Sequence, residues 1–110
     1  MQEEIVLCAA STYEQKYYLN EIFDGLPHSV KDELKVMCVL FTEDVGGVIE
    51  LVYNEEGELE FRTSFDETDY LYDEIGSALK VKDLQRSKKD LLESLQIFYQ
   101  VIVLGQFEEE

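Results

Sequence analysis

The sequence predicts an α+β fold, an antiparallel sheet of about four strands with helices packed on it, in the order ββαββαα. Two observations lead to this prediction. Stretches typical of strands come in two adjacent pairs, at residues 5–20 and 48–65. Stretches with the 3.6-residue period of amphipathic helices lie between and after these pairs, which favours local hairpins over parallel crossovers.

The first strand pair is predicted from residues 5–10, IVLCAA, and residues 13–20, YEQKYYLN. The first run is continuously apolar, as in a buried strand, and Ser11 and Thr12 break it. The second run alternates loosely, but Tyr13 and Tyr17 are also spaced i, i+4. Residues 5–20 therefore form either two strands or a strand and a helical turn.

The first helix is predicted to follow Pro27, a residue well suited to the first turn of a helix. Gly46 and Gly47 end it. One face carries the apolar residues with the helical period, which are Val30, Leu34, Met37, Cys38 and Phe41.

A hairpin is predicted from residues 48–53 and 58–65, joined by Asn54, two glutamates and Gly57. Asn first and Gly last is typical of a type I turn that closes with a positive φ. The second strand alternates apolar and polar residues from Leu59 to Phe65. On the first strand, the partners on the buried face are expected to be Ile49, Leu51 and Tyr53.

An acidic turn at residues 66–69 precedes another predicted helix, and residues 69–104 form either one helix or two. We expect its inner face to consist of Leu71, Ile75, Ala78 and Leu79, with Gly76 allowing a neighbour to approach closely. The last helix begins near Ser87 or already at Asp83, and Gly105 is a natural stop. Residues 1–105 are predicted to be a single globular domain, and residues 106–110 an acidic tail.

The net charge of −16 over 110 residues repels nucleic acid and anionic lipid, so we expect no nucleic-acid or membrane partner, and any partners are expected to be basic proteins or cations. The longest apolar runs are far shorter than a membrane span, and residues 1–4 lack a basic signal region, which predicts a cytoplasmic protein. Cys8 and Cys38 lie in apolar runs and are expected to be buried thiols, a single bridge between them being the alternative.

No catalytic signature is present, and the only histidine, His28, has no partner suited to acid–base catalysis. We therefore expect a non-enzymatic protein that needs no cofactor. The weak candidates for a metal site are acidic residues that hard cations would require to converge: Asp66, Glu67, Asp69, Asp73 and Glu74.

Five of the nine cations lie close together in an otherwise acidic chain: Lys80, Lys82, Arg86, Lys88 and Lys89. They either offset the surrounding acids or form a basic strip that docks on an acidic face of a copy of this chain or of another protein. The apolar C-terminal run contains Phe98, Tyr99 and Ile102. It is either core or the interface of a homodimer.

Several segments together resemble a small uncharacterised bacterial family, a domain of unknown function from low-GC Gram-positive bacteria. These are YEQKYYLN, LPHSVKDELKVMCVLFTEDVGG, YLYDEIGSALKVKDLQ and LLESLQIFYQVIVLG. The resemblance extends over nearly the whole chain. The resemblance implies a bacterial, cytoplasmic origin and no particular mechanism.

The specific function is unknown from the sequence. The favoured hypothesis is a small non-enzymatic protein-interaction or regulatory module that binds a protein partner or itself, as a homodimer through the C-terminal helix. One alternative is a metal- or small-ligand-binding domain at residues 66–74. A further alternative is an acidic nucleic-acid mimic that binds a basic protein.

Overall fold

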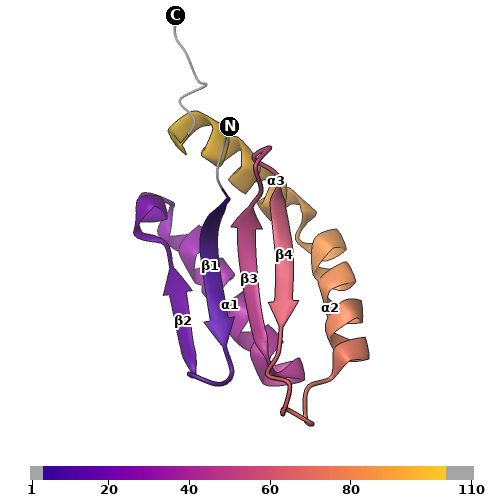
Figure 1. Ribbon diagram of the computed structural model, residues 1–110. Coiled ribbons are helices and arrows are strands. Elements are labelled where there is room, and N and C mark those ends of the chain that lie inside the picture. Colours follow the sequence, from indigo (N-terminus) through magenta and orange to yellow (C-terminus); the bar gives the residue numbers. More distant parts are fainter. Residues whose placement is uncertain (1–3, 104–110) are drawn as a thin grey trace, which may run out of the picture.

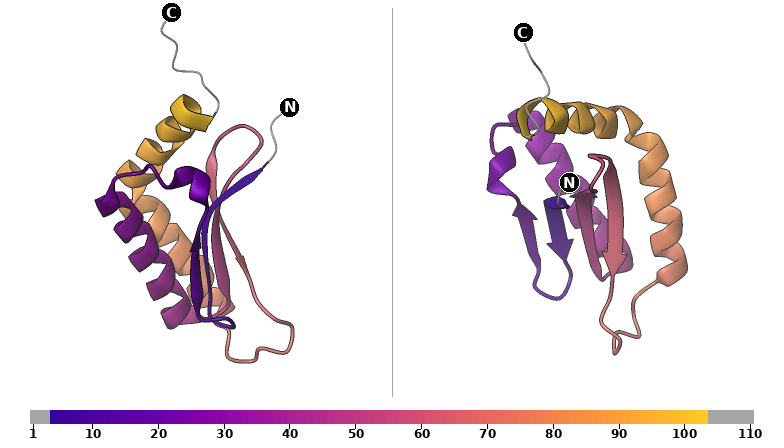
Figure 2. Two further views of the ribbon diagram at one scale, coloured as in Figure 1. Left: turned by 90° about the vertical axis from the view of Figure 1, so that its left-hand side faces the viewer. Right: turned by 45° about the horizontal axis from the view of Figure 1, so that its top comes forward.

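The computed structural model describes residues 4–103, which form an antiparallel sheet with its helices on one face (Figures 1 and 2). The order ββαββαα is confirmed. The strands are β1 (Ile5–Ser11), β2 (Lys16–Leu19), β3 (Val48–Tyr53) and β4 (Leu59–Ser64). The helices are α1 (His28–Val45), α2 (Glu74–Ser87) and α3 (Lys89–Phe98), with a 3-10 turn η1 (Glu21–Phe23) and a π-helical end η2 (Tyr99–Val103).

The sheet has the order β2-β1-β3-β4, and its three pairings are all antiparallel. Two local hairpins, β1–β2 and β3–β4, therefore meet through β1 and β3 at the centre. Residues 5–20 contain two strands, which decides between the two readings of that segment. The register shifts between Val6 and Cys8. This irregularity explains how two consecutive residues, Leu7 and Cys8, are both 0% exposed in a strand.

The core lies between the sheet and α1. Ile49, Leu51 and Tyr53 are each 0% exposed on the helix-facing side of β3, as their alternation predicts. Cys8 and Cys38 are free thiols whose sulfur atoms are 3.8 Å apart across the sheet–helix interface. The hydrogen bond to Cys8, together with burial, raises the pKa of the Cys38 thiol.

The opposite face of the sheet carries no helix in the described part of the chain (Figure 2). Arg62 on β4 donates two hydrogen bonds, of 2.7 and 2.8 Å, to the carboxylate of Glu4, and one of 3.0 Å to Glu60. The Arg62–Glu4 ion pair crosses the outer face of β3, and Val52 on that strand is only 3% exposed. Hydrogen bonds from Arg62 lower the pKa of Glu4, and hydrogen bonds from Asn54 and Arg62 lower that of Glu60.

The reversal after α1 depends on Gly46 and Gly47, whose φ angles are +82° and +71°. The Gly46 N–H donates to the Thr42 carbonyl at 2.9 Å and ends the helix. A Cβ on Gly47 would lie 2.6 Å from the Ser64 carbonyl oxygen and 2.5 Å from Cε1 of Tyr72. The glycine therefore lets β3, β4 and the Tyr72 ring pack together.

The expected inner face of α2 is wrong. The helix begins at Glu74, because the Asp73 carboxylate accepts the Gly76 N–H at 2.8 Å and caps it. Ser77 is buried, Val81 and Leu84 pack against the core, and Leu71, Ile75 and Leu79 are exposed. The reason is where the helix lies. Helix α2 runs beside the β4 edge of the sheet (Figure 1), and α1 and α3 cover only one narrow face of it. The group nearest to Gly76 is its own cap, Asp73.

Helix α3 is separate from α2 and closes one end of the sheet (Figure 1). The Tyr53 hydroxyl donates to the Leu95 carbonyl at 2.7 Å, and the Gln96 side chain accepts the Leu59 N–H at 3.0 Å. The Tyr99 ring stacks on Tyr53 with centroids 4.2 Å apart. Across the described helices, none is long and apolar enough to cross a membrane.

Candidate interaction surface

The most unusual surface feature is a set of four large apolar side chains, all within residues 70–79, that are exposed to solvent. Tyr70 and Leu71, before α2, are 92% and 93% exposed, and Ile75 and Leu79, on its first turns, are 76% and 64% exposed. Single exposed apolar residues are common, but four such exposed side chains within residues 70–79 of a small domain are typical of an interaction site. We call these four residues the apolar stripe.

The loop that presents Tyr70 and Leu71 is fastened at several points. The Tyr13 hydroxyl donates to the Asp69 carboxylate at 2.6 Å and accepts the Asp66 N–H at 2.9 Å. Phe65 and Tyr72 stack with ring centroids 4.4 Å apart. These contacts tie the loop to the β1–β2 turn and to β4, so the backbone that carries the two exposed side chains is held in place.

The electrostatics of this loop are consistent with that role. Hydrogen bonds from the side chain and backbone of Thr68 lower the pKa of Asp66. Desolvation, followed by the hydrogen bond to Asp69, raises the pKa of the Tyr13 hydroxyl.

Charged residues of opposite sign flank the apolar stripe. Glu67, in the acidic turn before it, is exposed, and its side chain makes no hydrogen bond to another residue of the described chain. Lys82 and Arg86 follow Ile75 and Leu79 at spacings of three and four residues, which places all four on one helix face. Arg86 is already paired with Asp83, so Lys82 is the cation of this face that has no ion pair in the described chain.

The five clustered cations do not act as one free strip. Lys80 bonds to Asp44, and Lys88 bonds to Glu33 at 3.0 Å, so both join α2 or its end to α1. Arg86 pairs with Asp83 of its own helix at 2.8 Å. Lys82 and Lys89 are exposed and have no ion pair within residues 4–103. Two members of the cluster, Lys80 and Lys88, therefore neutralise acids of α1. Lys82 and Arg86 lie on the outer face of α2.

A groove of about 520 Å³ runs between α1 and α2. Its wall includes Val36 and Leu40 of α1, which are 55% and 50% exposed, and Leu84 of α2. The Lys80 and Lys88 ion pairs lie along it. This groove is a second apolar surface, but its apolar side chains are less exposed than those of the stripe, and both of its lysines are paired with acids of α1.

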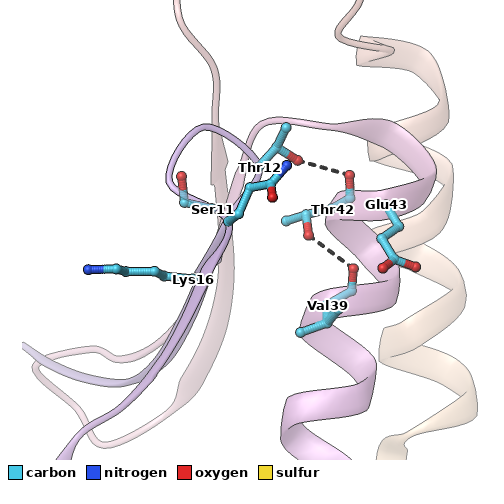
Figure 3. Close-up of a pocket in the computed structure, with 7 residues that line it drawn as sticks. Ser11, Thr12, Lys16, Val39, Thr42 and Glu43 are labelled. Carbon is cyan, nitrogen blue, oxygen red and sulfur yellow. Dashed lines mark hydrogen bonds between the residues drawn. The ribbon is translucent and has the colours of Figure 1, made fainter.

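A polar pocket of about 440 Å³ lies between the β1–β2 turn and α1 (Figure 3). The Thr12 hydroxyl donates to the Thr42 carbonyl at 3.0 Å, and the Thr42 hydroxyl to the Val39 carbonyl at 3.0 Å. Lys16 points away from the helix (Figure 3). The hydroxyls thus satisfy backbone groups and hold the turn against the helix, and no acid–base pair for catalysis is assembled there.

The five candidate metal ligands do not share one binding point in the described structure, where no group of three or more such side chains is close enough to hold an ion. Asp66 accepts hydrogen bonds from Thr68, Asp69 from Tyr13 and the Leu71 N–H, and Asp73 from Gly76. Glu67 and Glu74 are exposed. The acidic residues that bond internally serve to shape the turn.

The other predicted site residues lie apart from the stripe. Tyr99 is 0% exposed and belongs to the core, so it is unavailable to a partner, and Phe98 is half-buried against that core. The side chain of Ile102 and the predicted tail at 106–110 lie outside the described residues. His28 is on the exposed first turn of α1, with its ring 3.7 Å from Asp32.

Sequence reasoning missed the apolar stripe because the spacing of Leu71, Ile75 and Leu79 matches that of a core face. One signal could have found it. Asp73 stands three residues before Gly76 and is a good N-cap, which moves the helix start to Glu74 and leaves Leu71 outside the helix.

No curated protein and no solved structure matches this chain. Residues 4–107 match a family described only as a family of unknown function, DUF6145. Because this match spans nearly all of the 110 residues, the chain belongs to the DUF6145 family.

Proposed function

We propose that this chain is a small non-enzymatic protein-interaction module of the bacterial cytoplasm, and that it binds its partner through the apolar stripe. The observation that carries the proposal is the exposure of Tyr70, Leu71, Ile75 and Leu79 on a fastened loop and the start of a helix. Leaving four large apolar side chains in water sacrifices burial free energy, which a binding surface recovers when its partner covers it. The bacterial and cytoplasmic origin rests on the segments that resemble a low-GC Gram-positive family.

Two helices offer matched substitutions for the test. Leu79 of α2 and Ile97 of α3 are 64% and 61% exposed, so replacing either with Gln removes a similar apolar surface without opening the core. Leu79→Gln alters the stripe, and Ile97→Gln alters the C-terminal helix. Equal unfolding midpoints would show that both variants fold like the unchanged protein.

The experiment immobilises the unchanged protein and both variants, exposes them to a bacterial extract, and then purifies each captured protein for titration. We expect a partner that binds the unchanged protein and Ile97→Gln with equal dissociation constants. For Leu79→Gln we expect a dissociation constant at least tenfold larger, which corresponds to about 1.4 kcal/mol. The proposal is rejected when no binding, to another protein or to itself, depends on Leu79.

A further inference from the structure

We propose that Cys8 and Cys38 form a reversible disulfide when a peroxide oxidises the protein, and that this bond joins helix α1 to strand β1. The two sulfur atoms are 3.8 Å apart, and both thiols are free and 0% exposed. The inference goes beyond the proposed function, because the pair lies in the core between the sheet and α1 and shares no residue with the apolar stripe.

The two cysteines are held side by side by elements that are far apart in the chain. Cys8 lies on β1 and Cys38 on α1, 30 positions later. Cys8 is paired with Leu19 of β2 on one side and with Leu51 of β3 on the other, so its backbone is fixed in the middle of the sheet. A disulfide bond is about 2.0 Å long, so each sulfur has to move by only about 0.9 Å to form it.

A tyrosine hydroxyl is buried beside the two thiols. Tyr17 is paired with Ala10, two residues from Cys8, so its side chain lies diagonally next to Cys8 on the helix-facing side of the sheet. The hydroxyl makes no hydrogen bond within residues 4–103. Burial, followed by the neighbouring Cys8 and Cys38, raises its pKa. An oxygen atom bound to the Cys8 sulfur would give this hydroxyl a hydrogen-bond acceptor.

The oxidation takes two steps. One cysteine, as its thiolate, attacks a peroxide oxygen, so that an S–O bond forms, the O–O bond breaks, the sulfur is oxidised to a sulfenic acid and the peroxide is reduced to water. The other thiol then loses its proton and attacks the sulfenic sulfur, so that the S–S bond forms and the oxygen leaves as a second water. Two thiols and one hydrogen peroxide thus give one disulfide and two waters.

Burial decides when this reaction occurs. The hydrogen bond to Cys8, together with burial, raises the pKa of Cys38, and the thiolate is the reactive form of a cysteine. The first step therefore takes place when α1 parts from the sheet and water and peroxide enter. When the helix returns, the sulfenic sulfur again lies beside the second thiol, and the disulfide then holds the two elements together.

The bond changes the stability of the protein in a measurable way. Because it joins residues 30 positions apart, it restricts the unfolded chain. We expect the melting temperature of the oxidised protein to lie about 10 °C above that of the reduced protein. In a reducing cytoplasm such disulfides are transient, so a thiol reductant is expected to reverse the change.

The test treats the purified full chain with hydrogen peroxide, with and without urea below the unfolding transition. The remaining thiols are then blocked in denaturant and the peptides mapped by mass spectrometry, because the two methionines also take up oxygen. We expect a Cys8–Cys38 bond within one chain, formed faster with urea, and a higher melting temperature, both reversed by dithiothreitol. Sulfinic or sulfonic acid at either cysteine, a bond between two chains, or thiols that stay free in urea would overturn the proposal.

Variants test the two-step route. Cys38→Ala lacks the second thiol, so we expect peroxide to leave its melting temperature without a rise and a sulfenic acid at Cys8 to be trapped by dimedone. Adding Tyr17→Phe removes the hydroxyl that would bond to the sulfenic oxygen, and we expect the sulfenic acid to be shorter-lived by about threefold. Absence of trapped sulfenic acid, or an equal lifetime without the hydroxyl, would contradict this route.

Discussion

Replacing Gly47 with alanine tests how closely the β3–β4 hairpin, α1 and the Tyr72 ring pack. The new Cβ would lie 2.6 Å from the Ser64 carbonyl oxygen, a backbone atom, and 2.5 Å from Tyr72 Cε1. At φ = +71° the residue is also in the left-handed region, which costs a non-glycine residue about 1 kcal/mol. Moving the backbone to relieve the contacts costs about 1–3 kcal/mol more.

We expect Gly47→Ala to lower the free energy of unfolding by about 3 kcal/mol and the melting temperature by about 12 °C. Urea unfolding followed by circular dichroism measures this directly, and the dependence on urea concentration should not change. Gly25→Ala is the matched control, because its Cβ would meet nothing within 4 Å and its φ is not positive. That change should stabilise the protein by about 0.5 kcal/mol.

A second background separates the two causes. In Tyr72→Ala the ring is absent, so Gly47→Ala loses the contact with the ring but keeps the strained φ and the contact with Ser64. Its cost should then be smaller than in the unchanged protein without vanishing. A Gly47→Ala protein as stable as Gly25→Ala would refute the packing described for this corner.

Three further predictions follow from burial and charge. Leu79→Ala should change the free energy of unfolding by less than about 0.5 kcal/mol, because this side chain is exposed. Leu34→Ala, at a side chain that is 0% exposed, should lower it by about 2–5 kcal/mol. Equal losses in urea unfolding would contradict the exposure of Leu79 on α2. Arg62→Gln should lower the urea midpoint at pH 7, and this effect should be lost as the pH falls below about 4.5. The reason is that the pKa values of Glu4 and Glu60, the two carboxyls paired with Arg62, are lowered in the folded protein. A difference in midpoint that does not depend on pH would contradict this prediction. Cys8 and Cys38 should react with a thiol reagent only as fast as the protein opens, and at once in urea, since both are 0% exposed.

The sign of the Arg62 prediction follows from the direction of the shifts. A carboxyl whose folded pKa lies below its unfolded pKa stabilises the folded protein when it is ionised in both states. That contribution is present above the ordinary value of 4.5 and is lost as the pH falls through the folded pKa. Both carboxyls are exposed, so solvent screening keeps the effect small.

The stretches that could be predicted were those whose pattern depends on near neighbours. Ile49, Leu51 and Tyr53 alternate with the two-residue period of a strand, and all three are buried. Gly57 has a φ of +83°, as the closing position of the predicted turn requires. In both cases the local geometry of the chain decides the outcome.

The face of α2 could not be predicted in the same way. Periodicity shows that Ile75 and Leu79 share one face of the helix. It shows just as well that Ser77, Val81 and Leu84 share the opposite face. Which face is covered depends on where α1 and α3 lie. The same limit applied to Tyr99, whose apolar surroundings favoured a core but also suited an interface. Its burial and its stacking on Tyr53 place it in the core.

The sequence by itself determined the α+β class, the order ββαββαα, the two hairpins and the burial of both cysteines, because periodicity, turn residues and apolar runs act over a few positions. Only the tertiary structure decided that Lys80 and Lys88 are paired with α1, that the two thiols are adjacent, and that the apolar stripe faces water. These features join segments tens of residues apart, and packing in three dimensions alone sets the distances between them.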